Sequence, residues 1–138
     1  MRLTMEQYFG RWINSPDVTP SRTANAAHLI EQCNKLIVLA EAGGVKFLDN
    51  PHTECCVSGE TFGGFRPQSC AQGAPNSAHK EGMAVDLFDP RGEIDAWCMA
   101  HQDQLKELGI YMEHPDATVG WSHWGTRAPL SGHTVFYP

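Results

Sequence analysis

Apolar residues recur at three- and four-residue spacing in the first third of the chain, and this spacing predicts a helix over about 23–42. Thr23 is a candidate N-cap, and the glycine pair Gly43 and Gly44 would end the helix. The apolar positions would share one face of that helix and turn it toward a core: Leu29, Cys33, Leu36, Ile37 and Ala40.

The second half of the chain alternates between strand and helix patterns. The segment MAVDLFD (83–89) predicts a strand with Val85 and Leu87 on one face and Asp86 on the other. The order of elements predicts an α+β domain, in which a small, mostly antiparallel sheet packs against two main helices. The other expected elements are one helix over about 92–108, short strands in IYME (110–113) and GWSHWGT (120–126), and an edge strand in HTVFYP (133–138).

Glycine, proline and cysteine are frequent in the segment 55–82, where the pattern predicts a short strand near 54–58 and otherwise loop. A long loop inside a compact domain is usually functional. Residues 1–22 are predicted to form a short amphipathic turn and a proline-containing connector. With 138 residues, the whole chain (1–138) is expected to be one domain.

Composition excludes several classes of function. Hydrophobic residues make up 41% and charged residues 19% of the chain, which is ordinary for a globular protein. The net charge of −6 and the absence of a basic patch argue against a nucleic-acid partner. No apolar run reaches the roughly 18 residues of a membrane span. The N-terminus lacks the apolar stretch of a signal peptide, so we expect a protein that is cytoplasmic when made.

The cysteines give no sign of a disulfide framework. They are odd in number and contain no CxxC pair. In a cytoplasmic protein we expect them reduced: Cys33, Cys55, Cys56, Cys70 and Cys98.

Two histidines and an aspartate form the most informative polar pattern. Asp86 lies between apolar neighbours in a predicted strand, so its carboxylate must be paired, hydrogen-bonded or bound to a metal. His79 precedes it across a turn that Gly82 allows to bend sharply, and His123 lies in a later strand. Two histidines and one carboxylate, with a fourth position left to water, are typical of catalytic zinc. These residues alone leave open that each histidine is a hydrogen-bonded residue of the core.

Three segments carry a resemblance to a known family. SAHKEGMAVD (77–86) fits the pattern SxHxxGxAxD of the M15 zinc peptidases, which include D-alanyl-D-alanine carboxypeptidases and phage endolysins. GWSHWGTRAP (120–129) resembles the W-x-H segment that carries their last zinc ligand. GGFRP (63–67) resembles their upstream S-G-[FY]-R-P segment. Both ends of the chain also resemble those of small phage-encoded members.

The resemblance implies roles for individual residues. His79, Asp86 and His123 would bind one Zn²⁺ per chain. Ser77 would support the site by hydrogen bonding. Arg66 would lie near the substrate, where it would bind a carboxylate or polarise the scissile carbonyl.

The catalytic base is the point at which the sequence departs from the family pattern. Many members carry an acid three residues before the last histidine ligand, and this chain has Gly120 there. Glu113, in an E-x-P segment similar to that of the small phage-type members, is the favoured base, with Asp116 as the alternative. His114 is a further candidate, for stabilising the tetrahedral intermediate.

Two tryptophans flank the last candidate ligand. We expect one of Trp121 and Trp124 to pack in the core and the other to line the cleft, with Trp121 as the candidate substrate-binding residue. The pattern does not decide between them.

The sequence therefore predicts a zinc metallopeptidase that cuts stem or cross-link peptides of peptidoglycan, as an endolysin-like endopeptidase or a D-Ala-D-Ala carboxypeptidase. Release to the cell wall would need a separate membrane-permeabilising partner. A cysteine peptidase using Cys70 is a weaker hypothesis, because no Cys–His–polar signature accompanies it. The other rival is a non-catalytic zinc-containing module that binds cell wall or protein, which the glycine at position 120 suggests.

Overall fold

A mixed β-sheet organises the chain. The computed structural model describes residues 2–72, 74 and 76–138, and these residues form a four-stranded sheet in the order β1-β3-β2-β4. Two of the pairings are antiparallel, β1 with β3 and β3 with β2, whereas β4 runs parallel to β2 at the predicted edge. The expected α+β class is confirmed. The strands are β1 (Ala84–Asp89), β2 (Tyr111–Glu113), β3 (Gly120–Gly125) and β4 (Val135–Phe136).

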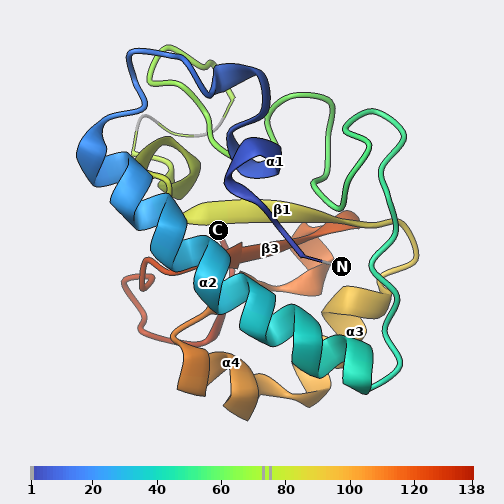
Figure 1. Cartoon of the computed structure of the whole chain (residues 1–138). Coiled ribbons are helices and arrows are strands. Elements are labelled where there is room, and N and C mark those ends of the chain that lie inside the picture. The colour runs from blue at the N-terminus through green and yellow to red at the C-terminus, as the bar shows by residue number, and fades with distance from the viewer. Residues whose placement is uncertain (1, 73, 75) are drawn as a thin grey trace.

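Helices pack beside this sheet, and the longest, α2, runs diagonally across it in the view of Figure 1. α3 and α4 follow β1 and contact α2. α1 is a short N-terminal helix that begins with a capping box between Thr4 and Gln7. The α-helices of the described residues are α1 (Met5–Phe9), α2 (Pro20–Ala42), α3 (Glu93–Ala100) and α4 (Gln102–Leu108).

The long helix begins three residues before the predicted start. Its N-cap is Thr19, whose side chain accepts a hydrogen bond from the backbone N–H of Arg22, and Pro20 occupies the first helical position. Proline favours that position because its fixed φ suits a helix and its missing N–H would have had no partner there. The predicted cap at Thr23 is therefore wrong, and the connector ends at Thr19.

The single helix predicted over 92–108 is wrong as well, because His101 divides it into α3 and α4. His101 adopts φ −131° and ψ 38°, outside the helical region. Its Nδ1 hydrogen-bonds the Trp97 carbonyl at 2.7 Å, and its ring stacks on the Trp97 ring with centroids 4.1 Å apart. The His101 side chain thus hydrogen-bonds a carbonyl group that would accept a backbone hydrogen bond in a continuous helix.

The strand predicted near 54–58 is present only as two isolated bridges, which join Asn50 to Cys55 and Val57 to Leu87. Around them, backbone hydrogen bonds join the loop to β1: Ser58 N donates to the Asp86 carbonyl, and Phe88 N of β1 donates to the Cys56 carbonyl. This loop therefore lies along the edge of β1 that does not face β3.

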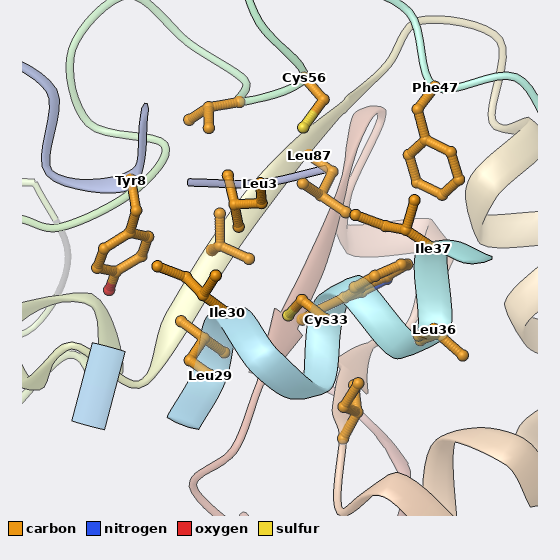
Figure 2. Close-up of a cluster of buried hydrophobic side chains, with 14 of the residues drawn as sticks. Leu3, Tyr8, Leu29, Ile30, Cys33, Leu36, Ile37, Phe47, Cys56 and Leu87 are labelled. Carbon is orange, nitrogen blue, oxygen red and sulfur yellow. The ribbon is translucent and has the colours of Figure 1, made fainter. Parts of the chain in front are cut away.

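The hydrophobic core lies between α2 and one face of the sheet (Figure 2). Val85 and Leu87 of β1 are fully buried there, as is Trp124 of β3, whose ring meets the Phe47 ring edge-on at 6.1 Å. Trp124 is thus the core tryptophan, which the sequence left undecided. The predicted apolar face of α2 is also buried: Leu29, Cys33, Leu36, Ile37 and Ala40.

A close approach of two backbones joins α1 to the loop beside the sheet. Gly64 lies so near α1 that a Cβ at this position would be 2.0 Å from the Tyr8 carbonyl oxygen. That oxygen accepts a hydrogen bond from Phe65 N at 3.0 Å, and the Tyr8 hydroxyl donates to the Ala84 carbonyl at 3.0 Å. The segment GGFRP is thereby fixed between α1 and β1.

This packing makes Gly64→Ala a strongly destabilising change. Because the clash is with backbone rather than with a flexible side chain, we expect the free energy of unfolding to fall by at least about 3 kcal/mol, the upper end of typical overpacking costs. Gly132→Ala is the control, since Gly132 has φ +72° but open space around it, and should cost only about 1 kcal/mol of backbone strain. Equal losses in urea unfolding would contradict the close approach.

The cysteines allow a second prediction. All five are free thiols, and only Cys70 is partly exposed. Burial raises the pKa of Cys56 to about 12 and that of Cys33 further, so these thiols are poor nucleophiles. In the native protein, a thiol reagent should react quickly with Cys70 alone, and the fast phase should vanish in Cys70→Ser. A count well below five after unfolding in denaturant would show disulfides instead.

Candidate metal centre

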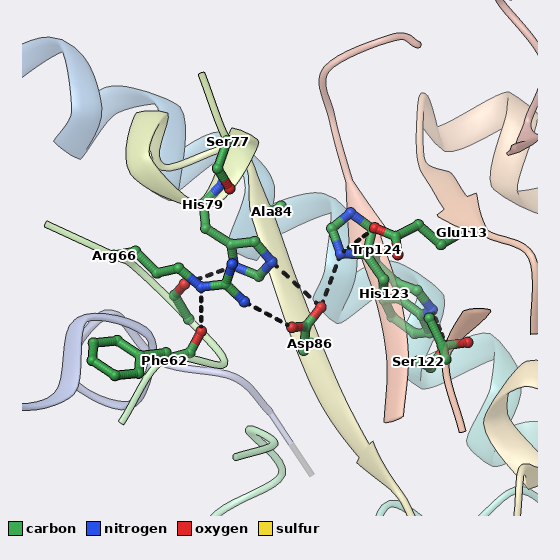
Figure 3. A network of polar contacts seen from close by, with 12 residues as sticks. Phe62, Arg66, Ser77, His79, Ala84, Asp86, Glu113, Ser122, His123 and Trp124 are labelled. Atoms are coloured by element: carbon green, nitrogen blue, oxygen red, sulfur yellow. Dashed lines mark hydrogen bonds and ion pairs between the residues drawn. The ribbon is translucent and has the colours of Figure 1, made fainter. Parts of the chain in front are cut away.

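The candidate ligands come from one turn and two neighbouring strands. Asp86 of β1 and His123 of β3 are direct cross-strand partners, so their side chains lie on the same face of the sheet. His79 belongs to η2, a 3₁₀ turn over Ala78–Glu81 that precedes β1. The structure thus brings together the three residues that the sequence suggested as ligands (Figure 3).

The turn before β1 is shaped by a serine and a glycine. The Ser77 side chain accepts a hydrogen bond from His79 N at 3.3 Å and caps the turn. Gly82 ends the turn at φ +75°, and a Cβ there would lie 2.6 Å from the Arg22 carbonyl oxygen. Ser77 therefore holds the backbone of His79, and Gly82 allows the chain to turn into β1.

Distances within the group fit a metal ion. His79 Nε2 lies 3.4 Å from Asp86 Oδ1, and His123 Nδ1 lies 2.8 Å from the same oxygen. One ligand atom from each residue lies within 4.8 Å of the other two. In a tetrahedral zinc site with bonds of about 2.1 Å, neighbouring ligand atoms are about 3.4 Å apart. The group could therefore hold a metal ion once its side chains adjust to this spacing.

Further contacts orient the ligands from outside. His79 Nδ1 is 2.8 Å from the Gly64 carbonyl oxygen, which makes Nδ1 the donor and leaves Nε2 facing Asp86. Arg66 donates from Nη2 to Asp86 Oδ2 at 3.3 Å and from Nε to the Phe62 carbonyl at 2.8 Å. Such second partners are a regular feature of metal sites because they fix the tautomer of histidine and the direction of carboxylate.

Electrostatics keep the carboxylate ionised. Burial alone would raise the pKa of Asp86, but the adjacent His79 and His123 outweigh it and hold that pKa well below its usual range. Burial lowers the pKa of His123, yet the hydrogen bond and charge of Asp86, with the charge of Glu113, raise it overall. In the metal-free protein a proton on His123 thus competes with a metal for the imidazole.

Glu113 lies beside the group. Its Oε2 is 3.3 Å from His123 Nδ1, and its side chain is 17% exposed. β2 pairs with β3, so the alternation along β2 places Tyr111 and Glu113 on the face that carries His123, while Met112 is buried in the core.

The two neighbouring candidates lie elsewhere. The Asp116 side chain is 80% exposed and lies 3.6 Å from His114 Nδ1. The His114 ring stacks on Tyr137 with centroids 4.5 Å apart. Neither residue is among the described residues that line the cleft around the candidate ligands. Of the carboxylates in question, geometry favours Glu113 over Asp116 as the one that can reach a metal-bound group.

The three candidate ligands line a cleft of about 460 Å³. Ser77, Arg66 and Trp121, the residues suggested for substrate binding, also line it. A second hollow of about 350 Å³ adjoins it, shares Arg66, Asp86 and Trp121, and is otherwise lined mainly by the loop 58–63. The open surface therefore extends from the candidate ligands in two directions.

Several cleft residues were missed by the sequence reasoning: Asn76, Tyr111, Arg127 and Phe136. The period of two in IYME was a usable signal for Tyr111, since Glu113 lies two residues further on. Arg127 lies within the GWSHWGTRAP segment, two residues after β3 ends. No local signal marked Phe136, which comes to the cleft through the parallel pairing of β4 with β2.

Comparisons with models of known protein families, with curated proteins and with solved structures found no match to this chain. Among the helices of the described residues, none combines the length and the apolar character that crossing a bilayer would require.

The site predicts one bound metal ion per chain. His79→Ala, Asp86→Asn and His123→Ala should each weaken zinc binding by more than about 100-fold, which exceeds the usual effect of losing an outer partner. His133→Ala, an exposed histidine outside the cleft, is the control. Elemental analysis after dialysis against zinc gives the stoichiometry, and circular dichroism shows whether each variant is folded. Wild-type binding retained in all three variants would place the metal elsewhere.

Proposed function

We propose that this chain is a zinc-dependent peptidase that hydrolyses the peptides of peptidoglycan. The observation that carries the proposal is the buried His79–Asp86–His123 group with Glu113 beside it in an open cleft. Two imidazole nitrogens and one carboxylate oxygen leave a coordination position for water, as catalytic zinc requires, whereas structural zinc is usually closed by four protein ligands. The resemblance of residues 63–127 to the M15 zinc peptidases supports the same reaction and suggests the substrate.

The proposed chemistry divides between the metal and Glu113. Zn²⁺ held by the three ligands would supply a Lewis acid and an activated water. Glu113 is the general base: its carboxylate takes a proton from the attacking water and returns it to the leaving amine. Its position in β2, next to the His123 strand, would compensate for the glycine at position 120, where many M15 peptidases carry the acid.

Arg66 has two tasks in this proposal. Its Nη2 and Nε are directed at Asp86 and at the Phe62 carbonyl, so it holds the ligand carboxylate in place. It also lines the cleft, where its positive charge would stabilise the oxygen that becomes negative as the carbonyl is attacked. Because the guanidinium is engaged by Asp86, the structure gives less support to Arg66 as a clamp for a terminal carboxylate.

The shape of the open surface favours an endopeptidase. A carboxypeptidase needs room for only one residue beyond the cut bond. Here a hollow adjoins the cleft beyond Arg66 and Asp86, so a substrate chain has space on both sides of the candidate ligands. Mass spectrometry of purified peptidoglycan digested with zinc-loaded protein would test both the activity and the bond. Intact peptidoglycan after incubation with a fully metal-loaded protein would instead favour the non-catalytic binding module.

Glu113→Gln separates catalysis from metal binding. We expect it to keep the fold and the metal and to lower kcat by about 10²–10⁴-fold, the usual contribution of a positioned general base. Asp116→Asn, which changes an exposed carboxylate three residues after Glu113, is the matched control and should have little effect. The roles would have to be exchanged if the Asp116 variant were the inactive one.

A further inference from the structure

Two charged side chains line the open surface but take no part in the contacts at its centre, and neither is paired with an opposite charge among the described residues. Arg66 pairs with Asp86, and Glu113 lies beside His123. Arg127 lines the cleft that contains the candidate ligands, and Glu60 lines the adjoining hollow. Both are exposed, and neither has an ion-pair partner within the described residues, 2–72, 74 and 76–138.

These two charges lie on opposite sides of β1. Arg127 follows the end of β3, where Gly125 pairs with Ala84 along one edge of β1. Glu60 belongs to the loop that bonds to the other edge, through Ser58 N to the Asp86 carbonyl and the Val57 bridge to Leu87. Asp86, which lines both hollows, is therefore between them.

We propose that the cleft is electrically polar and binds a peptide with a carboxylate on the Arg127 side of the metal and an ammonium group on the Glu60 side. The inference rests on the proposed function and deepens it, because it names the charge pattern of the substrate. It also assigns the recognition of a substrate carboxylate to Arg127 rather than to Arg66.

The chemistry of each group suits this assignment. Arginine presents a planar fork that can bind a carboxylate through two parallel hydrogen bonds. A bound divalent cation would add to the positive potential of the Arg127 side, which favours anionic groups there. Glu60 is exposed in the adjoining hollow and has no ion-pair partner among the described residues, so its negative charge is available to an amine.

Peptide hydroxamates test this without requiring turnover, because the hydroxamate group binds zinc directly. Three matched probes would end in a neutral amide, a carboxylate or an ammonium group, and calorimetry on zinc-loaded protein would give their affinities. We expect each charged probe to bind wild type about fivefold more tightly than the neutral one, as for an exposed ion pair. In Arg127→Glu, the carboxylate probe should bind more weakly than the neutral probe. In Glu60→Lys, the ammonium probe should bind more weakly than the neutral probe.

Matched controls separate local recognition from net charge. Arg91→Glu, on the turn after β1, and Glu107→Lys, on α4, change the net charge equally and should leave both advantages in place. If the charged probes bind no better than the neutral one, or the controls act like the cleft variants, the inference is overturned. Failure of all three probes to bind also overturns it. The expected pattern of affinities without any cleavage of peptidoglycan would refute the peptidase proposal and leave the polarity of the cleft established.

Discussion

The antiparallel register of β1 and β3 is the constraint on which the site depends. It makes Asp86 and His123 direct partners, so that one oxygen and one nitrogen are 2.8 Å apart before any metal is considered. A slip of one strand by one residue would place the two side chains on opposite faces of the sheet. The register is fixed in turn by the other face of the same strands, where Val85, Leu87 and Trp124 are fully buried.

The sheet thus separates two kinds of chemistry by its two faces. One face packs against α2 and contains the largest apolar side chains, and the other carries the ionisable groups of the cleft. Because Asp86 and His123 are nearly inaccessible to water, their charges interact strongly, and the carboxylate remains ionised only through its neighbours. The stability of the core and the geometry of the site therefore share the same backbone hydrogen bonds.

A third support comes from the segment GGFRP. Gly63 accepts a hydrogen bond from Asp86 N, Gly64 accepts one from His79 Nδ1, and Arg66 binds the Asp86 carboxylate. Its two glycines allow it to lie directly against the backbones of Ser58 and Tyr8, where a Cβ would clash. It links α1, the turn before β1 and the strand itself, and its Arg66 lines both hollows.

The sequence by itself determined the α+β class, the strand that carries Asp86 and the three candidate ligands, because period-two alternation and short-range motifs are local properties. It did not determine where α2 begins or that His101 interrupts the second helix, since a cap and a side-chain hydrogen bond compete there with the apolar pattern. Tertiary structure decided the rest. It buried Trp124 in the core and placed Glu113 beside His123. It also brought Arg127 and Glu60 to opposite sides of β1. Each depends on which strands and loops become neighbours, and those contacts join residues far apart along the chain.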